Sequence, residues 1–263
     1  MTTDVGWALN PLPRRIILSR KGLDSAAGGL ASPILIDRGN ALLSLPIPDC
    51  GTGIRYEDLR SEYVTETTIG SMLNDLSANQ NFSRQELHLD PDLREDAISR
   101  SEPFKPAFGQ CGGEQSHLDN PAHGADSGEN TDLFLFFGYF RKARLDKLLN
   151  RWRYVRGKRL HVIHSWMQVG EATRIVGPSQ DWSKHPHGIP SFLVRTDQQR
   201  RSAGKRNNTI YTPRNRLTFN PEICGYGVFS SLHPDIQITD PGGRNRTQWR
   251  LPGFFRDKLS HLG

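Results

Sequence analysis

Apolar residues fall in short runs along most of the chain, and many of these runs have the length and spacing of β-strands. Residues 14–19 (RRIILS) form a β-branched run that predicts a first strand. Two similar runs, 32–36 and 42–47, flank the turn-forming residues 37–40 (DRGN). Because a tight polar turn between two apolar runs favours strand pairing, these segments predict a hairpin.

Two longer runs are apolar at almost every position. Residues 132–140 (DLFLFFGYF) and 160–169 (LHVIHSWMQV) therefore predict buried strands, and the four residues after the second run continue it outward. Two later runs, 208–212 and 225–230, predict short strands. Apolar residues between 56 and 76 recur at helical spacing and predict one or two helices.

The composition adds long loops to this picture. Hydrophobic residues make up 35% of the chain, and Gly and Pro number 25 and 17, so turns surround a modest core. The pattern predicts an α+β fold with a mixed or antiparallel sheet, flanking helices and long loops. We expect one domain over residues 14–258, an N-terminal extension at 1–13 and a C-terminal tail at 259–263.

The cysteines and the apolar runs limit the class of protein. Cys50, Cys111 and Cys224 are far apart and form no CxxC pair, which argues against a disulfide framework and a thiolate zinc site. Residues 1–12 lack a basic segment followed by an apolar run, so we expect no signal peptide. No run approaches the roughly 20 apolar residues of a membrane span. We therefore expect a cytoplasmic protein with no membrane partner.

The charge is unevenly distributed along the chain. Residues 1–140 carry 11 Lys or Arg and 20 Asp or Glu, whereas residues 141–263 carry 23 and 8. The two halves thus have net charges of −9 and +15, which sum to the +6 of the whole chain. A basic half that also contains Trp and Tyr predicts a polyanionic partner, either DNA or a modified nucleotide. The alternative is an ordinary solvated basic face.

The segment after the first predicted strand is a candidate anion site. Residues 19–29 (SRKGLDSAAGG) could form a nest of backbone amides around a phosphate, contacted by Arg20, Lys21, Asp24 and Ser25. The spacing is not that of a Walker loop. The alternative is a glycine-rich turn with no ligand.

A second candidate lies around a proline-containing turn. His88, Asp90 and Asp92 flank Pro91, which restricts the backbone and could aim an imidazole and two carboxylates at one point. Such a group suits acid–base catalysis or the binding of a hard metal ion. The alternative is an Asp that caps the next helix.

Two further histidines flank another proline. His185 and His187 are held apart by Pro186, an arrangement that suits metal binding or proton transfer near neutral pH. The alternative is a surface turn with two solvated imidazoles. Should this turn meet the earlier one, His88, Asp90, His185 and His187 would be the metal ligands, with a divalent metal as the candidate cofactor.

Residues in the irregular region 110–130 and several aromatic residues complete the candidates. Gln110 could bind a base edge, and His117 could act as a base. Trp182, which lies between polar residues, and Tyr211 could stack on a base. The alternatives are hydrogen bonds that hold the loop together and core packing of the aromatic rings.

Several segments occur in order along nearly the whole chain and together resemble one protein family. They are ILSRKGLDS (17–25), GG (28–29), SPI (32–34), LSLPIP (43–48), HLDPDL (88–93), FGQ (108–110), HL (117–118), DLFLFFG (132–138), LHVI (160–163), WMQVGE (166–171), HPH (185–187), NTIY (208–211) and WRLP (249–252). The chain resembles the third of the nucleotide modification associated domain families, which is associated with DNA base hypermodification. It departs from the family pattern at Leu23, at Thr131 and at His164–Ser165, where the family tends to have an aromatic residue and a glycine.

The two buried strands have a second, coarser resemblance. An Asp that opens an aromatic strand, followed by a strand that ends in Gln-Val-Gly-Glu, resembles the base-reading barrels of the PUA and EVE type. This resemblance implies a barrel-like sheet with an aromatic pocket that holds a flipped base.

The resemblance to the modification family implies a theme and leaves the reaction open. One hypothesis is an enzyme, a transferase or hydrolase, that acts on a modified base or nucleotide, with catalytic residues among Asp24, His88, Asp90, Asp92, His117 and His187. The residues expected to bind its substrate are Arg20, Lys21, Ser25, Gln110, Trp182, His185 and Tyr211. A second hypothesis is a non-catalytic reader that binds modified bases through a basic surface and an aromatic pocket. A third is a metal-dependent nuclease or nucleotidase of a defence system. Other proteins of a modification system are candidate partners.

Overall fold

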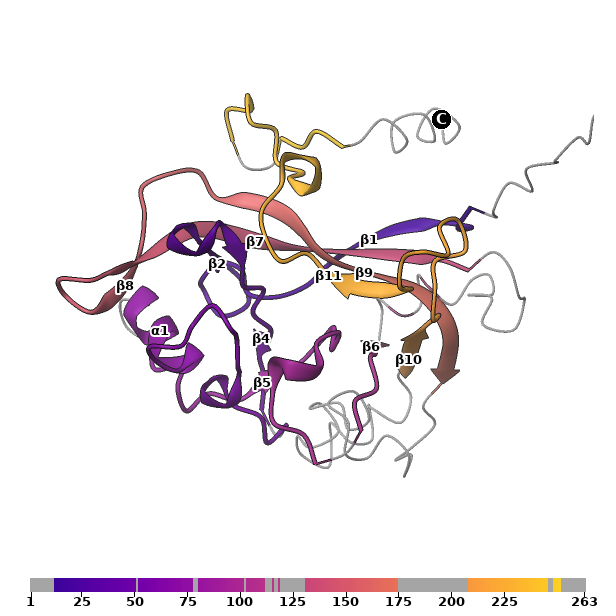
Figure 1. The fold of residues 1–263 in the computed structure, drawn as a ribbon, viewed down its shortest axis with the longest axis horizontal. Helices are drawn as coiled ribbons and strands as arrows, with labels where there is room; N and C mark the ends of the chain where they lie inside the picture. The colour runs from indigo at the N-terminus through magenta and orange to yellow at the C-terminus, as the bar shows by residue number, and fades with distance from the viewer. Residues whose placement is uncertain are drawn as a thin grey trace, which may run out of the picture.

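The fold is built on one large mixed β-sheet with a short α-helix, α1, beside it (Figure 1). The computed structural model describes residues 12–50, 52–77, 80–101, 103–111, 115, 118, 131–174, 208–245 and 248–251, without the side chains of residues 111 and 208. The sheet together with α1 confirms the predicted α+β fold class.

The central strand is β7 (Leu133–Asp146), which pairs along both of its edges. On one edge β1 (Ile16–Arg20) and then β2 (Ser32–Leu35) run parallel to it. On the other edge β9 (Leu160–Arg174) and then β8 (Arg151–Tyr154) run antiparallel to it. Because β7 is unusually long, its two halves have different neighbours.

The remaining strands extend the sheet outward. The hairpin partner of β2 is β3 (Ala41–Leu42), and β9 pairs with β10 (Asn208–Pro213) and β11 (Tyr226–Val228). The last strand, β6 (Phe108–Cys111), pairs with β10, so the order is β3-β2-β7-β9-β10-β6. Within the described residues no pairing joins β3 to β6. The sheet is open, and the expected barrel is not confirmed.

Most of the predicted strands are present, but one prediction was too short. The apolar run at 132–140 predicts a strand that ends at Phe140, whereas β7 continues to Asp146 and β8 returns from Arg151. Alternation explains why: Ala143 is buried between the exposed Lys142 and Arg144. A strand with one buried face and one charged face has this period of two.

The predicted helical region contains one short α-helix. Helix α1 (Ile69–Leu76) begins at Thr68, whose side chain accepts a hydrogen bond from the backbone amide of Ser71 at 3.1 Å. A 3-10 helix (Tyr56–Asp58) precedes it. Of the helices in the described segments, none is long and apolar enough to cross a membrane.

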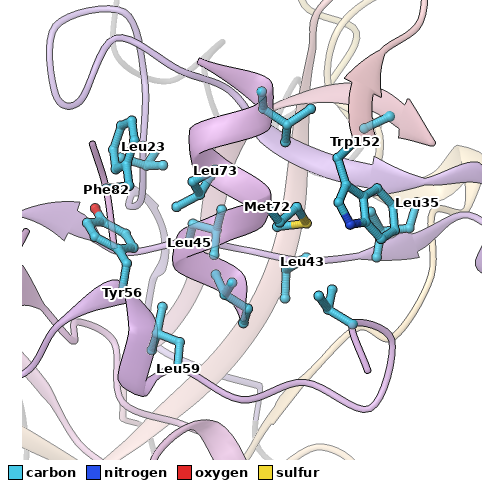
Figure 2. Packing of buried hydrophobic residues seen from close by; sticks show 14 of the residues in the cluster. Leu23, Leu35, Leu43, Leu45, Tyr56, Leu59, Met72, Leu73, Phe82 and Trp152 are labelled. Atoms are coloured by element: carbon cyan, nitrogen blue, oxygen red, sulfur yellow. The ribbon is translucent and has the colours of Figure 1, made fainter. Parts of the chain in front are cut away.

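One apolar cluster joins α1 to the sheet. Met72 of α1 lies beside Trp152 of β8, and Leu73 lies on the side of Leu45, as Figure 2 shows; Leu35 of β2 belongs to the same cluster. Both α1 residues and Leu35 are fully buried, and Trp152 is 1% exposed. Burial of a side chain of this size contributes roughly 2–3 kcal/mol. Helix α1 therefore holds β8 against the rest of the protein.

The small strands β4 (Ile47–Pro48) and β5 (Leu87–His88) form a separate antiparallel pair. Figure 1 shows this pair beside the large sheet, between α1 and β6. The chain continues from β5 into the proline-containing turn, where Asp92 exchanges two backbone hydrogen bonds with Ala107 at 2.9 and 3.0 Å. This bridge fixes the turn next to the start of β6.

Candidate functional site

A cavity of about 70 Å³ lies between the β4–β5 region and the large sheet. A single buried water needs about 10–15 Å³ on such a scale, so there is room for several waters or a small planar group. Its walls come from several distant parts of the chain, and its polar lining residues are Ser44, Arg60, Asp90, Asp92, Arg94, His164 and Ser165. The apolar walls include Leu43, Leu45 and Leu59, which also belong to the α1 cluster (Figure 2).

Three residues predicted separately meet beside this cavity. The Nζ atom of Lys21 lies 2.6 Å from Oδ2 of Asp90 and donates a second hydrogen bond to Oε1 of Gln110 at 3.2 Å. The amide of Gly109 donates to Oδ1 of Asp90 at 3.0 Å. Lys21 also lies over the ring of Phe108, 4.5 Å from its centre. With side chains only 15% and 9% exposed, Lys21 and Asp90 form a partly desolvated ion pair.

The turn at Gly22 places Lys21 at this position. Its φ is +94°, a value that favours glycine, and a Cβ atom there would lie 2.7 Å from the carbonyl oxygen of Leu45. The next amide, that of Leu23, donates to the same carbonyl at 2.8 Å. The close approach joins the end of β1 to the cavity wall.

Asp92 is the second carboxylate of the cavity. Its side chain is fully buried and receives two hydrogen bonds from the Arg100 guanidinium, at 2.9 and 2.7 Å. Burial raises the pKa of Asp92 to about 6, Arg100 opposes that shift, and the nearby Asp90 carboxylate adds to it. A carboxyl group with this pKa can exchange a proton near neutral pH.

A β-bulge brings His164 and Ser165 to the cavity. Phe136 of β7 pairs with Ser165, but the next residue, Phe137, pairs with Ile163, so His164 is an extra residue in β9. Bulges redirect side chains, and here two adjacent side chains both line the cavity.

The His164 imidazole is buried and neutral. Its Nδ1 atom and Oγ of Ser165 are 3.0 Å apart and share a hydrogen bond whose direction depends on the tautomer. Burial lowers the pKa of His164 to about 3, and the backbone carbonyl of Lys21 slightly opposes this shift. Within the described part of the chain, Nε2 of His164 makes no hydrogen bond of good geometry. The imidazole thus lines the cavity with its Nε2 atom buried beside the backbone carbonyl of Lys21.

The predicted anion loop is arranged around its own carboxylate. Oδ1 of Asp24 accepts hydrogen bonds from the amides of Ala26 and Ala27 at 2.6 and 2.7 Å. Arg20 forms an ion pair with Asp24, and Ser25 is exposed. These residues do not line the cavity, and their roles in anion binding and catalysis stay predictions.

His88 is turned away from the two carboxylates that follow it. Its Nδ1 atom lies 3.2 Å from Oδ2 of Asp49, at the end of the small strand pair. Of the predicted group, Asp90 and Asp92 line the cavity and His88 does not. In a strand alternate side chains share a face, but the chain turns at Pro91, and sequence spacing alone cannot place side chains across such a turn.

Tyr211 belongs to an aromatic cluster next to the site. It is fully buried, stacks on Phe108 at 5.5 Å between ring centres, and shares hydrogen bonds with the side chain of Gln115. Phe134 and Phe136 of β7 complete the cluster. Lys21 packs on the same Phe108 ring, so the aromatic cluster lies directly against the ion pair of Lys21 and Asp90.

Four predicted residues, His117, Trp182, His185 and His187, lie outside the described residues. In the described ranges no three His, Cys, Asp or Glu side chains gather so that they could hold a metal ion. The metal prediction that joins His185 and His187 to the turn at Asp90 therefore stays a prediction.

Several lining residues were not among the sequence candidates. His164 and Ser165 could have been found, because they are a polar pair inside an otherwise apolar run and depart from the family pattern. Arg100 carries no local signal of its pairing with Asp92. Arg60 is exposed and also lines the cavity, which places it at the opening, and no sequence pattern marks it.

The comparisons with known proteins agree with the sequence resemblance. Residues 15–262, nearly the whole chain, match the family model described as Nucleotide modification associated domain 3. Neither the curated proteins nor the solved structures contain a match to the chain.

Proposed function

The chain belongs to the nucleotide modification associated domain 3 family, and from this premise we propose that it is a DNA base modification enzyme. Family membership links it to nucleotide modification in general. The proposal goes further and assigns the reaction to the cavity between the β4–β5 region and the sheet, with a modified base or nucleotide as the substrate.

The observation that carries the proposal is the convergence of polar groups from distant segments on one buried space. Asp90 and Asp92 come from the proline-containing turn, His164 and Ser165 from the bulge in β9, and Arg60 from the segment before α1. Buried polar groups cost stability unless they are satisfied. A cavity that collects them is typical of a ligand site.

The residues suggest a division of roles. Arg60 at the opening would bind a phosphate, because a guanidinium matches phosphate geometry. The side chains of His164 and Ser165 would bind the edge of the base. Asp92 would exchange a proton with the substrate, since burial raises its pKa to about 6 and it lines the cavity. Asp90 and Lys21 would hold the substrate-facing wall in place.

Nucleoside mass spectrometry tests the proposal. Total DNA is compared from cells that carry the gene with its native neighbours and from cells with Asp90→Asn in the same context. We expect a nucleoside whose mass depends on the protein and whose level falls by about tenfold or more in the variant, a conservative figure for loss of a group at an active centre.

Asp235→Asn is the matched control, because Asp235 is 88% exposed and lies outside the cavity. It makes the same chemical change and should leave the nucleoside profile unchanged. Circular dichroism of both purified variants would confirm that they fold. Identical profiles in cells with and without the gene would overturn the enzyme proposal.

The alternative is a reader that binds a modified base without changing it, and the excess of basic residues after residue 140 favours it. Identical nucleoside profiles, together with binding of a modified duplex that Asp90→Asn abolishes, would establish this function instead. A metal-dependent nuclease is the second alternative. It predicts phosphodiesterase activity that a chelator removes, with ligands that include His185 and His187.

A further inference from the structure

Strand β8 and the second half of β7 form a two-stranded ribbon at one end of the large sheet, where residues 141–143 of β7 also pair with β2. The ribbon comprises residues 141–154, and residues 147–150 form its turn. β9 pairs with β7 only as far as Phe140, so the ribbon continues beyond the β9 edge of the sheet. In Figure 1 it extends to one end of the molecule, next to α1.

The inner face of the ribbon is anchored in the core. Ala143 and Trp152 are buried in the cluster that contains α1, and Leu145 and Tyr154 pack against it. The backbone amide of Trp152 donates to Oδ2 of Asp75 at 3.0 Å. The ribbon is therefore a fixed element of the fold, and its aromatic residues face inward.

The outer face is basic, and within the described ranges two of its four cations have no carboxylate partner. Lys142, Arg144, Arg151 and Arg153 are exposed, and Arg144 lies directly opposite Arg153 in the strand register. Like charges in this position destabilise a sheet. Arg151 and Arg153 have carboxylates at 3.5 and 3.2 Å, whereas within the described ranges Lys142 and Arg144 have none.

The basic character continues along the chain beyond β8. Residues 141–159 contain nine Lys or Arg and one Asp, a net charge of +8 within 19 residues. The Asp, Asp146, accepts hydrogen bonds from the amides of Leu148 and Leu149 at 3.2 and 3.4 Å. It therefore orders the turn as well as pairing with Arg153.

Two leucines stand at the tip of the ribbon. Leu148 is 97% exposed and Leu149 is 72% exposed, the first and third highest values among the large apolar residues that the structure describes. Apolar residues at the end of a basic arm can contact the apolar parts of base edges in the major groove, such as the thymine methyl group.

We propose that the β7–β8 ribbon docks on double-stranded DNA: its outer face, Lys142, Arg144, Arg151 and Arg153, binds the phosphates, and Leu148 and Leu149 enter a groove. A two-stranded ribbon fits the major groove of B-DNA, which is about 12 Å wide. Binding to single strands usually requires exposed aromatic rings that stack on bases. The ribbon turns Trp152 and Tyr154 inward, which favours the duplex.

The ribbon proposal rests on the proposed function in one respect only, namely that the partner of the protein is DNA. It names the surface that holds the DNA while the cavity, whose leucine walls share the cluster around Trp152, acts on a base. Binding to unmodified DNA requires no turnover. A failure of the ribbon proposal would therefore leave the mass spectrometry result standing, and the reverse also holds.

Fluorescence anisotropy with a labelled 30-base-pair duplex tests the outer face, with salt varied from 50 to 200 mM. We expect the logarithm of the affinity of the full chain to fall linearly with the logarithm of the salt concentration. Arg144→Gln combined with Arg153→Gln removes two phosphate contacts and should reduce the slope by about 1.8. The ratio of the affinity at 50 mM salt to the affinity at 200 mM salt should then be about tenfold smaller for the double variant than for the unchanged protein.

A charge-matched control separates the ribbon from the net charge of the protein. Arg55→Gln combined with Arg216→Gln removes the same charge from exposed positions outside the ribbon. This variant should keep the slope of the unchanged protein. Equal losses in the two double variants would overturn the proposal, as would equal or tighter binding to a single strand of the same length.

The tip needs a test of its own. Leu148→Ser combined with Leu149→Ser should weaken duplex binding several-fold and leave the salt slope unchanged, because no charge is removed. Sedimentation with vesicles of phosphatidylserine and phosphatidylcholine provides the contrasting partner, since basic arms with apolar tips also bind anionic membranes. Vesicle binding that the serine variant abolishes, without duplex binding, would overturn the DNA assignment.

Discussion

The cavity and the ribbon contain the same kinds of charged residue but treat them in opposite ways. At the cavity Lys21 and Arg100 are each matched with a carboxylate, and the side chains of both pairs are at most 15% exposed. On the ribbon Arg144 lies opposite Arg153 and has no carboxylate partner within the described ranges, whereas Arg153 pairs with Asp146 through a side chain that is 51% exposed. Burial makes an unmatched charge too costly inside, whereas water screens it outside. The unmatched charge on the surface is therefore available to a partner.

The largest expected effect is a loss of protein stability when the cation that pairs with the buried Asp92 is removed. Arg100→Met leaves a buried carboxylate without its cation and should lower the free energy of unfolding by about 3–5 kcal/mol at pH 8. Urea denaturation followed by circular dichroism measures it. Arg153→Met on the ribbon is the matched control and should cost about 0–1 kcal/mol. Equal losses in the two variants would contradict the distinction between the regions.

The pH dependence of Asp92 should give the next largest effect. Its pKa is raised in the folded protein from 3.8 to about 6, so the folded state holds the proton more tightly than the unfolded state does. The contribution of Asp92 to the free energy of unfolding is therefore fully present below pH 4 and is lost as the pH rises through 6, a change of about 3 kcal/mol.

Urea denaturation at pH 4, 5, 6 and 7 checks this with Asp92→Asn. The stability of the unchanged protein relative to the variant should fall across this range. A constant difference would show that Asp92 has an ordinary pKa in the folded protein.

The titration of His164 should change the stability of the protein with pH in the opposite direction to that of Asp92, over a similar pH range. Its pKa is lowered by burial from 6.5 to about 3, so the unfolded state takes up the proton first. Stability is therefore full above pH 6.5 and is lost by about 1.4 kcal/mol per pH unit as the pH falls below it, or about 2 kcal/mol at pH 5.

His164→Phe removes this titration and introduces the aromatic residue that is usual at this position in the family. Relative to the unchanged protein, the variant should gain stability as the pH falls from 7 to 5. If the two proteins respond equally to acid, the imidazole is not buried and neutral as described. Nucleoside mass spectrometry on the same variant separates packing from ligand binding.

The smallest expected effect concerns the ribbon, and it is a gain in stability rather than a loss. Arg144→Glu replaces a like-charge pair across the strands with an opposite pair and should stabilise the protein by about 0.2–1 kcal/mol. Thermal denaturation measures the gain, and duplex anisotropy should show weakened binding in the same protein. A variant that is less stable would indicate that Arg144 has a structural role.

The strands were largely predictable because a strand depends on local alternation and apolar runs. The runs at 14–19, 132–140 and 160–169 became β1, β7 and β9, and the turn at 37–40 joined β2 and β3. The extent of β7 was missed, because the many basic residues after residue 140 hid the alternation of buried and exposed positions. The expected barrel was not confirmed, since closure depends on pairing between the outermost strands rather than on any one strand.

The sequence by itself determined the family, the strand-rich character and the uneven distribution of charge. It also singled out Lys21, Asp90 and Gln110, one by one. Only the tertiary structure decided that these three meet, because their contacts join residues 69 and 89 positions apart. The bulge at His164 likewise depends on the register of two long strands. Local pattern sets what each segment prefers, but contacts between distant segments follow from the packing of the whole chain, which no local pattern encodes.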